Sequence, residues 1–448
     1  MLNLLWHLSI AVMKVHINQW FPRKWQLKKA EKRVIQSIHC AYEMVPYYRK
    51  KYDEAGVDIN SISSLEDLKR IPFITKEEIL EQYPEGIVAM GVDLKRCHYS
   101  ATTGSTGRSL PFIFNTSTYA FYLATSLRVY TMIGYRPWHK IAYIKYTAVE
   151  RMNFGPFFRA VHIPSILPVK DQIRRIRKER PDLLEGYASI ILEIARTATH
   201  EELKDIRPKF ISVNSEMSTQ EERDFISQIF GCPVYDEYST EETWMIASQC
   251  HKKNYHIFTD NVWVEFLNSN GDQVAPGEAG EMVLTTLQSP AMPFIRYRIG
   301  DIGRSNIDAC SCSIGFPLLK TFEGRADDSF ILPSGKSITA LKLLNAFTMH
   351  INKHLHLIEE FKLIQRKRDH IVIQLVIGKE FNEDRFQEIV NKLHEILGES
   401  VTITIEMVNS IPTNGSIKRK AIESHVNDRT SLTQRQASGE VKYISTPK

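Results

Sequence analysis

The middle of the chain alternates helix-forming stretches with short apolar runs, and this alternation restricts the fold more than any other feature of the sequence. Apolar runs of this length, bounded by helical stretches, are typical of strands. The alternation therefore predicts an α/β fold with a largely parallel sheet. The expected helices are 117–130, 183–197 and 220–230, and the expected strands are 141–144, 210–213 and 234–238.

Beyond the alternating region the pattern turns to strands and then reaches a domain boundary. Apolar runs at 262–267 and 282–287 flank a loop rich in Asn, Gly, Asp and Pro, which predicts a hairpin or a small barrel-like subdomain. The length of 448 residues allows about two to four domains. With the boundary near 324–328, we expect a large N-terminal α/β domain over 1–325, with parallel sheets and a β-rich subdomain, and a small mobile α+β domain over 326–428.

The two ends of the chain differ in character. Residues 1–54 read as helical, and the C-terminal region predicts a compact β-α-β unit. Its helix, 383–397, carries apolar residues on one stripe and lies between strand-like runs at 371–377 and 401–408. We expect this unit to be a small lid-like domain. The final segment, 429–448, is polar and is expected to be disordered.

The composition is that of an ordinary globular protein, with 43% apolar and 24% charged residues. A net charge of +5 is mild for this length, so no nucleic-acid partner is expected. Six cysteines are too few and too unevenly spread for a disulfide framework, and no secretory signal is convincing, which favours a cytoplasmic location. Basic runs at 23–33 and 174–178 are either solvated helix faces or sites for an anion or a membrane surface.

The first fifteen residues form an apolar cluster closed by Lys14. The cluster is shorter than the about 20 apolar residues that cross a bilayer, so no transmembrane segment is expected. An amphipathic helix docked on the protein is the first interpretation. Peripheral membrane contact through the N-terminus is the alternative. A homodimer is also left open.

The segment 102–108 concentrates glycine and small hydroxyl-bearing residues ahead of an apolar strand-like run. Glycines let backbone N–H groups approach a phosphate, hydroxyls add donors, and a terminal cation balances charge. The loop lacks the Gly-Lys-Ser/Thr ending of the Walker loop, which disfavours that class. Taken alone, the loop is equally compatible with a plain glycine-rich turn.

Five stretches stand in a fixed order along the chain: TGSTGR at 103–108, RPDLLEGY at 180–187, YSTEE at 238–242, PAMPFIRYRIGD at 290–301 and GRADD at 324–328. In this order they resemble the adenylate-forming superfamily, specifically the phenylacetate–CoA ligase family and its capsule-biosynthesis-type relatives. The resemblance covers about residues 40 to 425.

The resemblance implies a role around ATP for each stretch. Glu242 falls where the family has its Mg²⁺-binding glutamate, a hard oxygen ligand for a metal that bridges phosphates. Glu241 is the rival if the register slips by one, and Tyr238 would lie near the adenine and the α-phosphate. The residues expected to hold the β- and γ-phosphates are Thr102, Thr103, Gly104, Ser105, Thr106, Gly107 and Arg108, the last in place of a usual lysine.

Three further residues follow from the same resemblance. Asp301 resembles the aspartate that accepts hydrogen bonds from both ribose hydroxyls. Arg325 would act in catalysis close to the ribose or the phosphates, and Asp327 matches the hinge on which the C-terminal domain rotates. The implied reaction joins a carboxylate to the α-phosphorus of ATP, releases pyrophosphate and then passes the acyl group to a thiol, here that of coenzyme A.

The sequence departs from the family pattern at the catalytic lysine of the C-terminal domain. The motif here is GSIKRK at 415–420, so Ser416 occupies the lysine's position. Three interpretations follow. Lys418 replaces the missing lysine by a local shift of the chain, the adenylation step is slow, or the protein catalyses a different half-reaction. A neutral hydroxyl cannot offset phosphate charge as an ammonium does, and losing such a donor costs about 100- to 1,000-fold in rate.

The cysteines carry a second signal. Cys250, His256, Cys310 and Cys312 could supply three thiolates and one imidazole, a closed set of the kind that structural Zn²⁺ uses. Related ligases show a similar arrangement, although the Cys-Ser-Cys spacing is tighter than usual. Free buried thiols are the alternative interpretation, and His251 is an alternative ligand.

The small-molecule carboxylate substrate is expected to be an aryl or arylacetic acid, as in the family. By order along the chain its pocket would lie near Tyr143, Tyr146, Asn214, Ser215 and Glu216. ATP, Mg²⁺ and coenzyme A would be its cofactors. Two other hypotheses stay open. One is an adenylating transferase to an amine, a hydroxyl or a carrier-protein thiol in polysaccharide or secondary metabolism, and the other is a catalytically silent homologue.

Overall fold

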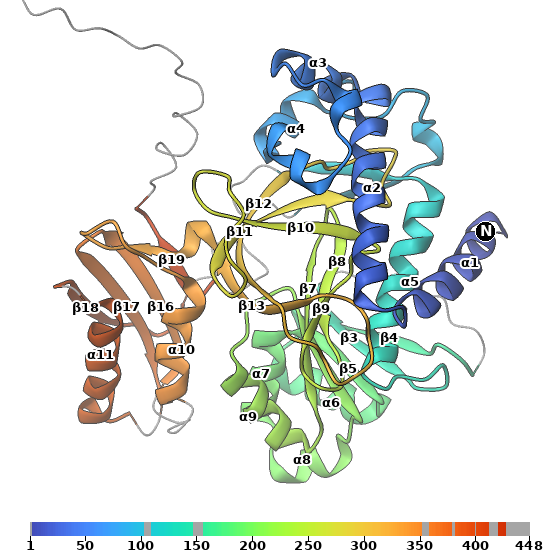
Figure 1. Ribbon diagram of the computed structural model, residues 1–448. Helices are drawn as coiled ribbons and strands as arrows, with labels where there is room; N and C mark the ends of the chain where they lie inside the picture. Colours follow the sequence, from blue (N-terminus) through green and yellow to red (C-terminus); the bar gives the residue numbers. More distant parts are fainter. Residues whose placement is uncertain are drawn as a thin grey trace, which may run out of the picture. The chain divides into compact units, whose positions relative to one another are not determined.

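The computed structural model, drawn in Figure 1, describes residues 2–102, 109–146, 156–351, 358–378, 381–398, 400–411 and 420–426. These residues form two compact units, and the boundary between them lies between Gly324 and Arg325. The expected disordered segment, 429–448, lies outside the described residues. Each unit has its own large sheet, so each is described by itself.

One mixed sheet of eleven strands runs through the first unit in the order β10-β11-β12-β13-β9-β8-β7-β6-β5-β3-β4. The prediction of a parallel sheet is confirmed for one half, in which neighbouring strands all run parallel. These strands are β3 (Ile141–Lys145), β4 (Ala160–Pro164), β5 (Leu183–Tyr187), β6 (Phe210–Asn214) and β7 (Val234–Thr240).

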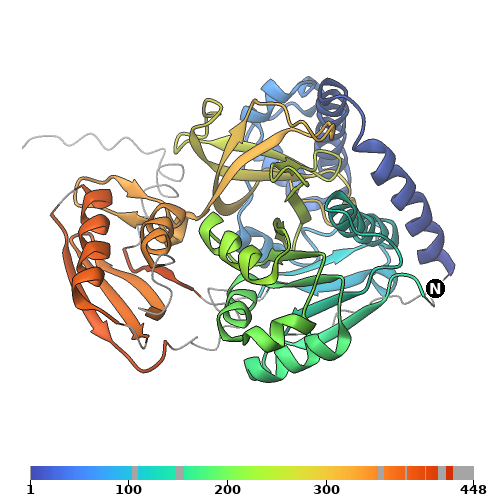
Figure 2. The same cartoon turned by 90° about the horizontal axis from the view of Figure 1, so that it is seen from below.

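Helices cover both faces of the parallel half (Figure 2). On one face α6 (Val169–Glu179), α7 (Ala188–Thr197) and α9 (Gln220–Phe230) pack apolar side chains against the strands. On the other face α5 (Thr116–Met132) packs against strand side chains that include Tyr143. Successive side chains of each strand therefore point to opposite faces of the sheet, as in any β-strand.

The expected single helix over 183–197 is wrong. The structure has β5 over the first five residues and α7 over the rest. Leu183 and Leu184 fit the apolar pattern of either element, so periodicity joined them to the helix that follows. Packing decides otherwise at Gly186, where a Cβ would lie 3.2 Å from the Ile144 side chain of the neighbouring strand.

The other half of the sheet is antiparallel. The predicted hairpin is confirmed as β10 (Val262–Leu267) paired with β11 (Ala279–Thr286). Of the two alternatives, a hairpin or a small barrel-like subdomain, the structure has the hairpin, which continues into the same eleven-stranded sheet. The strands that connect it to the parallel half are β12 (Tyr297–Asn306), β13 (Leu318–Arg325), β9 (Tyr255–Ile257) and β8 (Trp244–Gln249).

The predicted helical start is confirmed by α1 (Leu2–Asn18), α2 (Arg23–Met44) and α3 (Pro46–Glu54). In the described part of the chain, no helix is long and apolar enough to cross a membrane. Thr75 caps α4 (Lys76–Gln82), because its hydroxyl oxygen accepts a hydrogen bond from the Glu78 N–H. In turn, the Glu78 carboxylate accepts a hydrogen bond from the Thr75 N–H. The remaining elements are the hairpin β1 (His98–Ala101) and β2 (Pro111–Phe114), the helix α8 (His200–Asp205), and the 3₁₀ turns η1 (Ile59–Ser61), η2 (Leu65–Arg70) and η3 (Leu94–Arg96).

The second unit contains a four-stranded sheet in the order β18-β17-β16-β19. The predicted β-α-β unit is confirmed: α11 (Glu383–Leu397) connects β17 (His370–Ile377) to a parallel β18 (Thr402–Met407). The helix buries its apolar stripe, which includes Ile389 and Leu393. The sequence did not reveal β16 (Ile358–Lys367), β19 (Ile422–Ser424), α10 (Ala340–Ile351), η4 (Ala326–Asp328) or the short strands β14 (Phe330–Ile331) and β15 (Ser337–Ile338).

Candidate functional site

The centre of the candidate site is a hydrogen bond between Tyr238, in β7, and Asp301, in β12. The Tyr238 hydroxyl donates to Oδ2 of Asp301 over 2.7 Å, and both side chains are buried. The Tyr238 ring stacks on Phe322 of β13, with ring centroids 4.6 Å apart. Two residues that lie far apart in the sequence are therefore fixed side by side by the central strands of the sheet.

Glu242 lies in the turn that follows β7, and it differs clearly from its neighbour Glu241. Its side chain is 9% exposed, and Oε1 accepts a bond from the Tyr297 hydroxyl over 3.2 Å. Glu241 is exposed. The turn itself is closed by the Thr243 N–H, which donates to Oγ1 of Thr240 over 3.2 Å. Burial and a defined partner favour Glu242 over Glu241 as a positioned carboxylate.

The hydroxyl-rich loop begins and ends on the β1–β2 hairpin. Thr103, Gly104, Ser105, Thr106, Gly107 and Arg108 lie outside the described residues. The two ends of the loop are held together, because the Thr102 N–H donates to the Leu110 carbonyl and Oγ1 of Thr102 accepts from the Leu110 N–H, both over 3.0 Å. The Thr102 hydroxyl thus helps to close the base of the loop.

Arg325 ends β13 at the boundary between the units and is exposed, and Asp327 follows it in η4. The neighbouring Asp328 pairs with Lys420 over 2.7 Å, within the second unit. Burial raises the pKa of Asp328, and Lys420 lowers it in part. Ser416 and Lys418 lie outside the described residues.

The four proposed metal ligands come together in the structure. Cys250 follows β8, His256 lies in β9, and Cys310 and Cys312 lie between β12 and β13. Their ligand atoms all lie within 4.8 Å of one another. The Sγ atoms of Cys250 and Cys310 are 3.7 Å apart, and Sγ of Cys312 lies 3.2 Å from Nε2 of His256. All six cysteines of the chain are free.

The geometry of this cluster fits a tetrahedral metal, although burial raises the pKa of Cys250 and raises that of Cys312 to about 12. Two sulfurs bonded to one tetrahedral zinc lie about 3.8 Å apart, given Zn–S bonds of about 2.3 Å. Burial lowers the pKa of His256 to about 4, so its imidazole is neutral at pH 7, as a ligand must be. Burial would raise the pKa of Cys310, but hydrogen bonds from Cys312, Asn254 and Cys250 bring it below the ordinary value.

The parallel strands carry a polar cluster on the face that α5 covers, which sequence reasoning missed except for Asn214. In register, Glu185 of β5 lies beside Ser212 of β6. Glu185 accepts bonds from the Tyr130 hydroxyl over 2.5 Å and from Nδ2 of Asn214 over 3.1 Å. Glu237 of β7 accepts a bond from Ser212. The only sequence signal was acidic and polar residues at alternate positions of apolar strands.

The charge of Glu185 acts on its neighbour Glu237. Burial, reinforced by the charge of Glu185, raises the pKa of Glu237 to about 8, so the pair holds a proton at neutral pH. Lys145, at the end of β3, donates to Oδ1 of Asn214 and lies 4.6 Å from the centre of the Tyr187 ring. Lys145, Tyr187 and Asn214 are the last residues of their parallel strands, and open α/β sheets bind ligands at this end.

The residues expected near the acid pocket are distributed around this cluster. Tyr143 is buried in β3 on the same face, beside Glu185 in register. Tyr146 is partly exposed just beyond β3. Ser215 follows Asn214 with a φ of 67°, and Glu216 accepts a bond from the Ser189 N–H over 3.0 Å, which uses it at the start of α7.

Comparison with known proteins gives consistent matches. Residues 330–425 match the family described as the CapK C-terminal domain. The phenylacetate–coenzyme A ligase of Thermus thermophilus is 27% identical over 69% of this chain and 73% of its own length. Protein CapK of Staphylococcus aureus is 23% identical over 84% of this chain and 86% of its own.

The fold has a close structural counterpart. The crystal structure of 2-hydroxyisobutyryl-CoA ligase, in the postadenylation state with an acyl-AMP, superimposes with a TM-score of 0.76 at 22% identity and covers 94% of both chains. This match shows the α/β architecture of an adenylate-forming enzyme. The ordered motifs, the sequence relatives and the CapK C-terminal match all support a likeness of this chain to the phenylacetate–CoA ligase-like, capsule-type family.

Proposed function

We propose that the protein uses ATP to convert a carboxylic acid to an acyl-adenylate and then transfers the acyl group to the thiol of coenzyme A. The observation that carries this proposal is the buried Tyr238–Asp301 pair, together with Glu242, which lies in the turn after β7 and contacts Tyr297 of β12. A carboxylate has enough acceptor capacity to keep a bond from Tyr238 and also bind ribose hydroxyls. The relatives named as CoA ligases support the same reaction.

Glu242 fits the requirement for a Mg²⁺ ligand. Its carboxylate supplies the hard oxygen that Mg²⁺ prefers, and burial with the Tyr297 contact limits its rotamers. When bound there with ATP, Mg²⁺ supplies neutralisation of phosphate charge. In this proposal Asp301 positions the ribose, Tyr238 orients Asp301, and the loop 102–108 holds the phosphates so that the acid can reach the α-phosphorus in line.

For the acid itself, we propose an aryl or arylacetic substrate. Aromatic residues on one face of the parallel strands, Tyr143 and Tyr187, support a flat ring. The relative from Thermus thermophilus is named for phenylacetate. Glu185 and Glu237 lie on the same face, and their carboxyl groups can accept hydrogen bonds from hydroxyl groups. The acids to be tested therefore include ring-hydroxylated ones.

A second candidate is transfer to an acceptor other than coenzyme A, such as an amine, a hydroxyl or a carrier-protein thiol. It is favoured by one observation: the C-terminal segment 330–425 matches the CapK family, while Ser416 replaces the usual lysine. A catalytically silent homologue that binds nucleotide is the third alternative. Its support is the same serine together with Arg108.

The proposal is tested by ATP–pyrophosphate exchange over a panel of aryl, arylacetic, hydroxylated and aliphatic acids, with and without coenzyme A. We expect exchange with at least one acid, and acyl-CoA when coenzyme A is added. Exchange without any acyl-CoA supports the second candidate. ATP binding without exchange for any acid contradicts the ligase and supports the silent homologue.

We further propose that Cys250, His256, Cys310 and Cys312 bind a structural Zn²⁺. The support is the clustering of their ligand atoms within 4.8 Å and the sulfur separation of 3.7 Å, which suits a tetrahedral ion. The ion would join the β8–β9 turn to the segment before β13, and so stabilise the sheet on which Tyr238 and Asp301 lie.

A further inference from the structure

The helix α1 has two apolar faces, and only one of them is covered in the described structure. Its inner face, with Ala11 and Val15, packs against Ala124 of α5. Its outer face is exposed, with Trp6 at 66% and Ile17 at 55%. Because several large apolar side chains exposed together mark an interaction site, the outer face indicates a partner.

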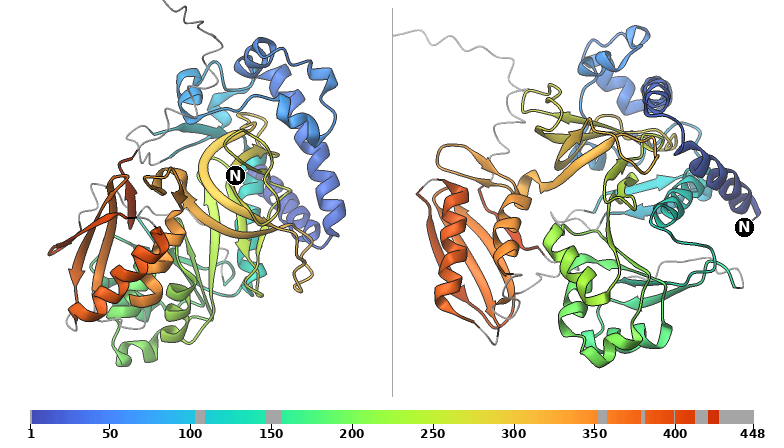
Figure 3. Two further views of the ribbon diagram at one scale, coloured as in Figure 1. Left: turned by 60° about the vertical axis from the view of Figure 1, so that its left-hand side comes forward. Right: turned by 60° about the horizontal axis from the view of Figure 1, so that its bottom comes forward.

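The exposed surface continues past the end of α1 onto the start of α2. Trp20 is 58% exposed, and Trp25 stacks on Phe21 with ring centroids 4.2 Å apart. We call this surface the N-terminal aromatic face, which consists of Trp6, Met13, Ile17, Trp20, Phe21 and Trp25. Figure 3 shows α1 at the outer edge of the first unit, with only its inner side against α5.

Within the segment 1–30 that carries this face, all charged side chains are basic. The first acidic residue of the chain is Glu31, whereas Lys14, Lys24 and Lys28 are all exposed beside the aromatic residues. Other cations of the same segment are used internally. Arg23 donates to the carbonyls of Ile307 and Asp308, and Lys29 donates to Oδ1 of Asn18.

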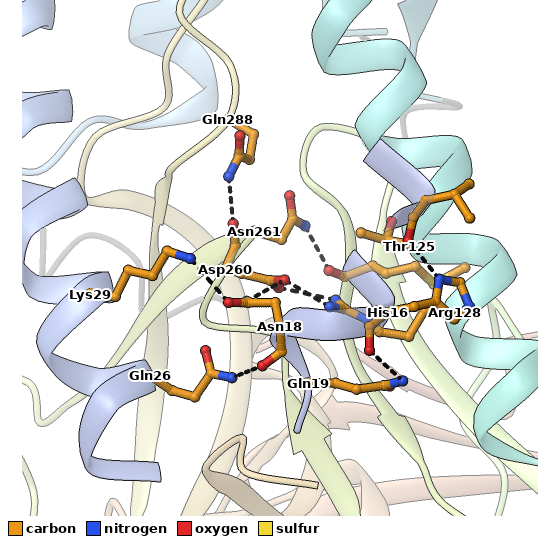
Figure 4. Close-up of polar contacts among 12 residues, drawn as sticks. His16, Asn18, Gln19, Gln26, Lys29, Thr125, Arg128, Asp260, Asn261 and Gln288 are labelled. Carbon is orange, nitrogen blue, oxygen red and sulfur yellow. Dashed lines mark hydrogen bonds and ion pairs between the residues drawn. The ribbon is translucent and has the colours of Figure 1, made fainter. Parts of the chain in front are cut away.

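A buried polar network fixes this face to the body of the first unit (Figure 4). Arg128 of α5 forms two bonds to the Asp260 carboxylate, over 2.8 and 3.1 Å, and Asn18, the last residue of α1, donates to the same carboxylate over 2.9 Å. The Arg128 side chain is fully buried against the ring of Phe258. The N-terminal aromatic face is therefore held in a fixed position on the first unit.

We propose that the N-terminal aromatic face docks the protein on an anionic lipid surface. Tryptophan rings favour the membrane interface, and lysines beside them are attracted by acidic headgroups. A second copy fits less well, because a two-fold contact would bring Lys14, Lys24 and Lys28 of both copies together. In the described residues no helix can cross a bilayer, so the contact is peripheral.

The test measures cosedimentation of the full chain with two kinds of vesicle, phosphatidylcholine alone and phosphatidylcholine mixed with phosphatidylglycerol. We expect binding to the acidic vesicles that weakens with salt. Replacing Lys14, Lys24 and Lys28 together by serine should reduce it on the order of a hundredfold. The matched control replaces Arg174, Arg175 and Lys178, three exposed cations of α6, and should leave binding unchanged.

A second pair of variants tests the apolar part of the face. Ile17→Ser and Trp20→Ser should each weaken vesicle binding severalfold, whereas Ile166→Ser, at an exposed apolar residue outside the face, should not. Unchanged unfolding midpoints show that these variants fold. Absence of binding to acidic vesicles, or equal losses in the controls, overturns the proposal. So does a dimer that Ile17→Ser dissociates in the absence of any vesicle binding.

Discussion

The hydroxyl of Tyr238 donates to the carboxylate of Asp301 over 2.7 Å, although 63 residues separate them in the chain. The contact joins β7 of the parallel half of the sheet to β12 of the antiparallel half. Tyr297, four positions before Asp301, reaches Glu242 in the turn after β7. Two contacts between the same segments thus hold both carboxylates of the candidate site.

Replacing Asp301 by alanine should raise KM for ATP on the order of a hundredfold, because two hydrogen bonds from ribose to a charged group are lost. Tyr238→Phe should raise it only about fivefold, since it removes one bond that orients Asp301. The measurement is KM in pyrophosphate exchange with ATP and with 2′-deoxy-ATP. The Asp301 variant should no longer distinguish these nucleotides. If it distinguishes them as well as the parent does, Asp301 does not bind the ribose.

Glu242→Gln should reduce pyrophosphate exchange by about 100-fold or more, because a neutral amide is a poor ligand for Mg²⁺ and cannot balance its charge. Glu241→Gln is the matched control, with the same change at an exposed neighbour, and should lose little. Exchange is measured over a range of Mg²⁺ concentrations, where the Glu242 variant should need more metal. A larger loss in the Glu241 variant would shift the assignment by one residue.

Lys418→Ala should reduce adenylation by about 100- to 1,000-fold if Lys418 has replaced the missing lysine. Ser416→Lys provides the complementary test. It should speed adenylation if the natural serine makes that step slow, and should change little if Lys418 already supplies the cation. Lys392→Ala, which breaks an exposed pair with Glu395, is the control for loss of one positive charge. Full activity of the Lys418 variant together with no effect of Ser416→Lys removes both residues from the mechanism.

Elemental analysis of the purified protein should find about one zinc per chain, as a set of three thiolates and one imidazole implies. Cys312→Ser should lose the metal and lower the unfolding midpoint. Cys232→Ser, at a buried cysteine outside the cluster, should keep the metal. The zinc proposal is wrong if the purified protein contains no zinc and its unfolding midpoint is the same before and after treatment with a chelator.

The Glu185–Glu237 pair should make stability depend on pH. The pKa of Glu237 is raised to about 8 from its ordinary value of 4.5, so the folded state keeps a proton that the unfolded state has released between these values. The contribution of this proton to the free energy of unfolding should be fully present below pH 4.5. It should decrease as the pH rises from there through about 8, by up to about 1.4 kcal/mol per pH unit. Denaturant unfolding across this range measures the slope.

Two variants identify the group responsible for that slope. Glu237→Gln should flatten it and raise stability near pH 8, because the amide carries no charge to desolvate. Glu81→Gln, at an exposed carboxylate, should leave the slope unchanged. An unchanged slope in the Glu237 variant would assign the pH dependence to other groups.

Local patterns in the sequence determined much of the architecture. Alternation predicted the parallel half of the sheet, and the apolar stripe of 383–397 predicted α11, because both follow from the short periods of strand and helix. The ordered motifs indicated the family and singled out Asp301 and Glu242. These features depend on residues close together in the chain, which is why the sequence alone could reveal them.

Other features were decided only by the tertiary structure. Periodicity could not separate β5 from α7, since the strand is defined by its neighbours β3 and β6. The sequence pointed to Glu242 but left Glu241 as the rival if the register slips by one, and burial beside Tyr297 distinguishes them. The raised pKa of Glu237 beside Glu185 and the outward apolar face of α1 likewise depend on contacts between distant segments. The physical reason is that sheet register and burial are set by contacts between distant segments, and the pattern of a single segment does not contain them.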